Sequence, residues 1–300
     1  MKNLLKRLLI FMLLITGTGA WLKNKFSCKD GNEAIKYAKI MRKKGFAPQF
    51  NILGEHYKDL NATDKLCDDY LDLIEKLKEA GISNISIVSV KPSSLGLDLN
   101  LPADSTESQI DHTIFYLRKI LLKAKGKGIF VRLDREGKKY DEAYQGIVNV
   151  LTKEFDNFGP CVQIGRKISV EEATNWNKLF IRICKGAYIK EREVKNKKNL
   201  RSSFIAVSKL ILLQGGTLEV ATHDVAIYDE LINFKNKEKN IEDKIIISVL
   251  KGKPVIFYLE SLNVKKSIYI PICRSLIKSL EYSVRRIEEE GIRLIAFFLK

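Results

Sequence analysis

The segment 179–191, LFIRICKGAYIKE, places two cations where a buried strand is expected. Its apolar run is interrupted by Arg182, and Lys185 ends the run just before the letters GAY. A charge in a protein core is costly unless an opposite charge meets it. The two side chains therefore predict an anionic partner, and the identity of that partner should indicate the function.

Further polar side chains follow the other predicted strands. In a barrel of parallel strands, the groups that do chemistry come from the carboxyl ends of the strands. Each such residue alone has an ordinary explanation, such as solvation or helix capping, so the prediction depends on their convergence on one rim. The residues at these ends, or on the helix after the last strand, are Glu55, His56, Lys91, Asp134, Arg135, Glu136, Gln163, Arg182, Lys185, Thr222, His223, Asp224, Tyr269, Tyr282, Arg285 and Arg286.

The convergent set is cationic, and its members are Lys91, Arg182, Lys185, Arg285 and Arg286. The planar donor fork of arginine suits carboxylate and phosphate groups. The site is therefore predicted to bind a carboxylate, a phosphate-bearing cofactor, or both. The chain has 3 His without metal-ligand spacing and no GxSxG sequence, so neither a metal site nor a serine nucleophile is expected.

Eight short apolar runs must position these side chains. Most are rich in Val and Ile, and such near-continuous apolarity is typical of a parallel sheet covered on both faces. The runs are 47–53, 85–91, 128–134, 159–165, 179–185, 217–223, 244–250 and 267–272.

Amphipathic helical patterns alternate with these runs. They cover residues 32–44, 64–80, 104–125, 140–154, 169–178, 200–214, 225–235, 253–263 and 275–290. The alternation predicts an α/β fold, a (βα)8 TIM-like barrel with N-terminal helices. A doubly wound open sheet is the structural alternative, but that fold usually carries a Gly-rich first turn, and no GxGxxG sequence occurs.

The composition is that of a globular protein, with 300 residues, of which 45% are hydrophobic and 29% charged. The net charge is +16, but the lysines are scattered over predicted helix faces and loops. Because no Arg–aromatic patch or zinc-finger spacing occurs, we expect solvated faces rather than a nucleic-acid partner. The five Cys include no CxxC pair, which favours buried thiols in a reducing compartment.

Residues 1–25 are interpreted as an apolar and basic N-terminal helix, and residues 26–300 as the barrel domain. Leu5, Leu8, Leu9 and Met12 form a stripe that favours a helix packed on the protein or on a membrane surface. The basic start and the small residues after the apolar stretch also resemble a signal peptide, and a membrane anchor is the third alternative. The stretch is short for a membrane span, which needs about 20 apolar residues.

Taken together, the motifs resemble those of proline dehydrogenase, a flavoenzyme family that oxidises L-proline to 1-pyrroline-5-carboxylate. RICKGAY resembles the family's Arg-Leu-Val-Lys-Gly-Ala-Tyr motif. Other family motifs are matched in order by NILGEH, SVKPSSLG, VRLDRE, Gln163, ATHD, IYIP and YSVRRIEEE. Each match alone is weak, but their shared order over about residues 26–290 is specific.

The resemblance implies a distorted (βα)8 barrel with FAD lying over the strand ends. The proline carboxylate would be held by Arg285, Arg286 and Lys91, and the ring surrounded by Ile183, Tyr188, Tyr269 and Tyr282. Asp134 would hydrogen-bond towards Tyr269, and Arg182 would lie near flavin N5. The catalytic set would thus be Lys91, Asp134, Arg182, Tyr269, Tyr282, Arg285 and Arg286. Cofactor contacts would come from Gln163, Arg182, Lys185, Gly186, Ala187, Thr222, His223 and Glu289.

The resemblance further implies a single-function enzyme of proline catabolism that passes electrons to a quinone. Such an acceptor would bring the enzyme into peripheral contact with a membrane. The expected location is therefore the cytoplasm or the inner face of the membrane, with the signal-peptide alternative left open.

Three positions depart from the family pattern. Ser248 and Lys251 stand where the family has Gln and Tyr, and Cys273 lies in a turn that lacks the expected glycine. The fourth run also reads QIG in place of Gln-Ala-Tyr. These departures bear on substrate fit and cofactor affinity.

Two other functions remain as alternatives. One is a different barrel enzyme that uses Lys91 or Lys185 as a Schiff-base nucleophile. The other is a non-catalytic basic barrel that binds an acidic surface or nucleic acid. Neither alternative requires the adjacent pair Arg285 and Arg286 on the helix after the last strand.

Overall fold

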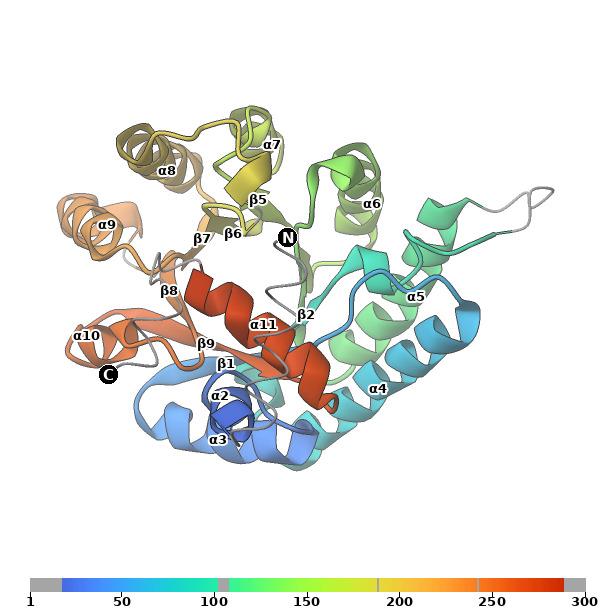
Figure 1. Cartoon of the computed structure of the whole chain (residues 1–300). Helices are drawn as coiled ribbons and strands as arrows, with labels where there is room; N and C mark the ends of the chain where they lie inside the picture. The colour runs from blue at the N-terminus through green and yellow to red at the C-terminus, as the bar shows by residue number, and fades with distance from the viewer. Residues whose placement is uncertain (1–17, 102–107, 188, 242, 289–300) are drawn as a thin grey trace.

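The predicted apolar runs form one all-parallel sheet in the computed structural model, which describes residues 18–101, 108–187, 189–241 and 243–288 (Figure 1). Within these residues the strand order is β4-β3-β2-β1-β9-β8-β7-β6-β5. The strands are β1 (Phe46–Ile52), β2 (Ile87–Val90), β3 (Phe130–Leu133), β4 (Phe158–Gly159), β5 (Cys161–Gln163), β6 (Phe180–Cys184), β7 (Thr217–Ala221), β8 (Ile245–Leu250) and β9 (Lys265–Ile272).

The sheet closes into a barrel at Pro160. β4 pairs with β3 and β5 pairs with β6, and only Pro160 separates β4 from β5. Proline has no N–H to donate to a ladder, so the fourth barrel strand is split there. The expected TIM-like (βα)8 barrel is confirmed, and the open doubly wound sheet is wrong.

Helices follow the strands and surround the barrel, as Figure 1 shows. They are α2 (Thr18–Phe26), α3 (Gly31–Lys43), α4 (Leu60–Glu79), α5 (Gln109–Lys125), α6 (Asp141–Glu154), α7 (Ser169–Asn175), α8 (Lys197–Leu213), α9 (Val225–Lys237), α10 (Val255–Glu260) and α11 (Leu276–Glu288). Short 3-10 turns lie at η1 (Ser83–Ile85), η2 (Pro92–Ser94), η3 (Lys138–Tyr140), η4 (Ile189–Glu191) and η5 (Lys239–Ile241).

The apolar core lies between the sheet and these helices, where Tyr70, Tyr144 and Phe204 are fully buried. The barrel interior is different, because it contains the buried polar side chains of Gln49 and Glu219. Branched apolar side chains normally fill the interior of a TIM barrel. A polar interior therefore requires internal partners for each group.

Helices α2 and α11 pack against each other and form a second, smaller hydrophobic cluster of Leu22, Phe26, Leu280, Tyr282 and Val284. Figure 1 shows α11 lying across the barrel with α2 beside it. The hydroxyl oxygens of Ser27 and Ser279 lie 2.6 Å apart and join the two segments. The N-terminal helix that the structure describes is therefore a packed element that supports α11.

The apolar stretch from Leu8 to Ile15, with its signal-peptide and anchor alternatives, lies outside the described residues. In the part of the chain that the structure describes, no helix is both long and apolar enough to cross a membrane.

Replacement of Leu280 by Ala tests the α2–α11 cluster. Because Leu280 is fully buried there, we expect Leu280→Ala to lower the free energy of unfolding by about 2–5 kcal/mol in urea denaturation. The matched control is Leu213→Ala, whose side chain is on a surface helix and 64% exposed. An equal, small loss in both variants would show that the two helices share no core.

Candidate active site

The guanidinium of Arg182 finds its anionic partners inside the protein. Nε donates to Glu219 Oε1 at 2.9 Å, and Nη1 donates to Asp134. Nη2 donates to Gln49 and, at 3.2 Å, to Ser89 Oγ. Burial alone would lower the pKa of Arg182, but the two carboxylates raise it above its ordinary value.

Glu219 is a residue that the sequence reasoning missed. It is a register partner of Arg182 in the neighbouring strand, and Arg132 Nη2 lies 3.2 Å from its second oxygen. Burial opposes ionisation of Glu219, but Arg182 and Arg132 lower its pKa. Burial also lowers the pKa of Arg132 to about 10. Each residue could have been found as a single charge within an apolar run. Arg132 lies in FVRL, and Glu219 lies in TLEVA.

The expected contact between Asp134 and Tyr269 is present. The Tyr269 hydroxyl donates to Asp134 Oδ2 at 2.6 Å, and the Arg182 guanidinium carbon lies 5.3 Å from the centre of the Tyr269 ring. Burial, followed by the negative charge of Asp134, raises the pKa of Tyr269 well above its ordinary value. The phenol therefore stays protonated and keeps Asp134 oriented.

A second group of side chains follows β1 and β2. Lys91 forms an ion pair with Glu55, and both are largely shielded from solvent. Nearby, the buried carboxylate of Glu136 accepts from the Ser93 amide at 2.8 Å and the Ser93 hydroxyl at 2.7 Å. Ser93 Oγ in turn accepts from the backbone N–H of His56 at 3.1 Å. The ends of the first three barrel strands are thus tied together.

Cations gather around His223 at the ends of β6, β7 and β8. Burial, with the charges of Lys253, Arg286 and Lys185, lowers the pKa of His223 to about 3. Lys185 Nζ lies 2.6 Å from Asp224, which is the acidic residue in direct contact with it. A positive potential around a neutral imidazole suits a ligand that carries phosphate. The residues present could therefore hold an anionic group of a bound ligand.

The backbone after β6 is fixed by its neighbours. Gly186 has a φ of +95°, which favours glycine, and a Cβ there would lie 3.3 Å from Gln163 Oε1. Gln163 Nε2 donates to the Arg135 carbonyl at 3.1 Å. Ala187 is exposed, and buried Thr222 accepts from the Asp224 amide at 3.3 Å. These contacts fix the backbone beside the cationic group, where Ala187 is the exposed position of the four.

The structure places one predicted site residue away from this cluster and does not describe three others. Ile183 is fully buried in the main core, because it alternates with Arg182 and faces the surrounding helices rather than the barrel interior. The expectation that it lines the substrate pocket is not supported by this placement. Tyr188 and Glu289 lie outside the described residues, as does the side chain of Arg285.

The last two predicted residues, Tyr282 and Arg286, lie on α11. Tyr282 is buried in the α2–α11 cluster, and the Arg286 guanidinium carbon lies 5.0 Å from the centre of its ring. Lys253 Nζ donates to the Arg286 carbonyl at 2.7 Å and ties α11 to the loop after β8. This contact holds Arg286 close enough to act on the pKa of His223.

The departures from the family pattern have structural partners. Lys251 Nζ donates to the carbonyls of Lys25 at 3.1 Å and Ser27 at 3.3 Å, at the C-terminal end of α2. A cation is favourable at this end of a helix. Lys251 therefore fixes α2 and, through it, α11. Ser248 Oγ lies 3.4 Å from Gln49 Nε2 in the polar barrel interior.

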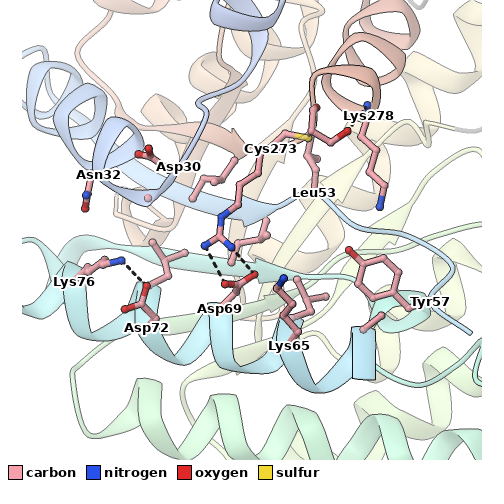
Figure 2. Close-up of a pocket in the computed structure, with 18 residues that line it drawn as sticks. Asp30, Asn32, Leu53, Tyr57, Lys65, Asp69, Asp72, Lys76, Cys273 and Lys278 are labelled. Carbon is pink, nitrogen blue, oxygen red and sulfur yellow. Dashed lines mark hydrogen bonds and ion pairs between the residues drawn. The ribbon is translucent and has the colours of Figure 1, made fainter. Parts of the chain in front are cut away.

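Two cavities lie beside this cluster rather than in it. One, of about 370 Å³, lies between α4 and the start of α11 (Figure 2). Figure 2 shows Asp69 and Asp72 on α4. Arg274 Nη2 lies 3.0 Å from Asp69 Oδ1. The other, of about 690 Å³, contains His56, whose Nδ1 lies 2.6 Å from Asp98.

Acid titration tests the buried imidazole. Because His223 has a pKa of about 3 in the fold and 6.5 ordinarily, the unfolded chain binds the extra proton between these values. Stability should therefore fall as pH decreases from 6.5, by up to about 1.4 kcal/mol per pH unit from this residue. As pH decreases below 6.5, the urea midpoint of His223→Asn should fall less steeply than that of wild type. If the midpoints of the two proteins fall in parallel with pH, the lowered pKa of His223 is contradicted.

Comparison with known proteins agrees with this architecture. A family model described as proline dehydrogenase matches residues 34–293. Proline dehydrogenase from Deinococcus radiodurans is 28% identical over 207 residues, covering 67% of this chain and 64% of the relative. The chain thus spans slightly less than two thirds of that protein.

Solved structures show the same fold. Proline utilization A from Bdellovibrio bacteriovorus, inactivated by N-propargylglycine, matches with a TM-score of 0.79 and 19% identity, over 92% of this chain and 33% of that one. A mutant of proline utilization A from Bradyrhizobium japonicum matches with a TM-score of 0.70 and 18% identity, over 91% and 31%. With the family match extending over most of its length, this chain belongs to the proline dehydrogenase family.

Proposed function

We propose that the chain oxidises L-proline to 1-pyrroline-5-carboxylate with FAD, the first step of proline catabolism. The observation that carries the proposal is the cluster of Arg182, Asp134 and Tyr269 at the carboxyl ends of the barrel strands, beside the cations around His223. Family membership over residues 34–293 supports the same reaction.

FAD would be held by the cationic group at the ends of β6 and β7. When bound, it supplies the acceptor for a hydride from the substrate. A diphosphate would be favoured electrostatically beside Lys185 and His223, and the left-handed φ of Gly186 lets the chain turn sharply beside them. Further contacts are proposed for Gln163, Arg182, Ala187, Thr222 and Glu289.

The substrate would lie between the polar cluster and α11. Its carboxylate would meet Lys91, Arg285 and Arg286, because fixed cations orient a carboxylate and charge-assisted bonds are the strong ones. Tyr188, Tyr269 and Tyr282 would cover the apolar ring and exclude water. The hydrogen bond from Tyr269 to Asp134 would keep this wall rigid, which favours a single reactive orientation.

The electron acceptor and location follow as further parts of the proposal. A quinone acceptor requires contact with a membrane surface, and the net charge of +16 is compatible with an anionic one. We therefore place the enzyme in the cytoplasm at the inner membrane face.

The Schiff-base alternative is less compatible with the site. Lys91 and Lys185 are each within hydrogen-bond distance of a carboxylate, Glu55 and Asp224 respectively. A Schiff-base lysine is usually activated by an apolar pocket or a neighbouring cation. Both lysines instead have a carboxylate as their direct partner, at the ends of β2 and β6.

Product trapping tests the proposed reaction. The purified protein, given L-proline and an artificial electron acceptor, should form a cyclic imine that condenses with an aromatic ortho-amino aldehyde. D-proline serves as the substrate control, since the fixed cations should orient one enantiomer. Acceptor reduction without a trapped imine would contradict the reaction.

The arginine pair tests the position of the substrate carboxylate. We expect Arg285→Met and Arg286→Met each to raise the KM for proline by about 10- to 150-fold, since losing one charge-assisted bond costs about 1.5–3 kcal/mol. Bound flavin should persist. Arg274→Met is the matched control, because Arg274 pairs with Asp69 outside the cluster. An unchanged KM in both test variants would contradict the carboxylate site.

A further inference from the structure

We propose that Glu219 is a positioning residue which, backed by Arg132, fixes the guanidinium of Arg182 for the hydride transfer proposed above. This inference rests on the proposed function and adds two residues to it. Both lie in the barrel interior, and both are fully buried.

Glu219 restrains Arg182 from the interior side. Arg182 donates from Nε to Glu219 at 2.9 Å, while Asp134 holds the Nη1 side. Gln49 depends on the same carboxylate, because its Nε2 donates to Glu219 at 2.7 Å and its Oε1 accepts from Arg182 Nη2. Ser267 receives the other Gln49 N–H at 2.8 Å. Removal of the Glu219 charge would therefore loosen two of the restraints on the guanidinium.

Arg132 connects this restraint to the closure of the barrel. Along β5 and β6, Arg182 N donates to Pro160 O at 3.0 Å and Ile164 N donates to Cys184 O at 2.8 Å. In a parallel ladder with this spacing, the next hydrogen bond would run from the backbone N–H of residue 160 to Phe180 O. Residue 160 is a proline and has no N–H to donate. Arg132 Nη1 donates to Phe180 O instead and to Pro160 O at 3.0 Å.

The backbone at the split leaves space for this guanidinium. A Cβ atom on Gly159 would collide with both the Phe180 carbonyl and Arg132 Nη1. The ring of Phe180 also lies 4.3 Å from the Arg132 guanidinium carbon. Arg132 is therefore fixed by the split strand, and its Nη2 forms an ion pair with Glu219 Oε2 at 3.2 Å.

The charges of this interior group balance. Arg132 and Arg182 carry two positive charges, and Asp134 and Glu219 carry two negative charges. Loss of the Glu219 charge alone would leave an uncompensated positive charge beneath the strand ends. A positive charge there favours electrons added to a bound flavin, so it raises the flavin midpoint potential.

The experiment compares wild type with Glu219→Gln as purified flavoproteins. In Glu219→Gln we expect kcat for proline to fall by about 10²-fold, the loss that a misplacement of about 1 Å causes. We also expect the flavin midpoint potential to move to a more positive value. In the double variant Arg132→Met/Glu219→Gln, which is again charge-balanced, the potential should return towards wild type.

The matched control is Glu172→Gln, which removes a buried carboxylate paired with Arg135 at 2.6 Å outside the barrel interior. It should lower the melting temperature without moving the flavin potential. If Glu219→Gln behaves like this control, with unchanged kcat and potential, the role of Glu219 is structural and the inference is overturned.

Two further outcomes are decisive. Should Glu219→Gln not fold, Glu219→Asp keeps the charge on a shorter arm, so its potential should stay near wild type while its kcat falls. A wild-type kcat in Glu219→Asp would overturn the inference. If the wild-type protein binds no flavin, both the proposed function and this inference are overturned. If proline bleaches the flavin of wild type and Glu219→Gln has the same kcat and flavin potential, this inference alone is overturned.

Discussion

The burial of one guanidinium, that of Arg182, constrains the rest of the site. A cation in the middle of a barrel strand is stable only with partners arranged around it. This barrel supplies Gln49 from β1, Glu219 from β7 and Asp134 from the position directly after β3. The interior of the barrel is polar for this reason. Tyr269 is connected to this network by its hydrogen bond to Asp134. The buried charges of the barrel interior therefore also hold Tyr269 at the strand ends.

The closure of the barrel and the orientation of the site are linked by the same network. Pro160 splits the fourth barrel strand, and Arg132 replaces the missing backbone donor with its side chain. The same guanidinium meets Glu219, which meets Arg182. On the other side, Lys251 and Lys253 tie α2 and α11 to the loop after β8. The proposed substrate site is therefore held by two separate sets of contacts, one in the barrel interior and one between α2, α11 and the loop after β8.

Much of the architecture could be predicted from the sequence, because strand-length Val/Ile runs alternate with amphipathic helices. The contact of Asp134 with Tyr269 followed from the resemblance of VRLDRE and IYIP to family motifs. Glu219 and Arg132 were missed because a single charge in an apolar run indicates burial without naming its partner. The register of β6 and β7 supplies that partner, and register across a closed barrel is a tertiary property. Ile183 was assigned to the pocket from its motif, although strand alternation with Arg182 turns it to the other face.

The most direct test of the account is the visible spectrum of the purified protein before and after addition of L-proline without oxygen. We predict the absorption bands of an oxidised flavin that bleach when proline is added, because the hydride must reach the bound cofactor. A yellow protein that does not bleach would contradict proline as the substrate. A colourless protein that cannot be reconstituted with FAD would contradict the central claim that these strand ends form a flavin site.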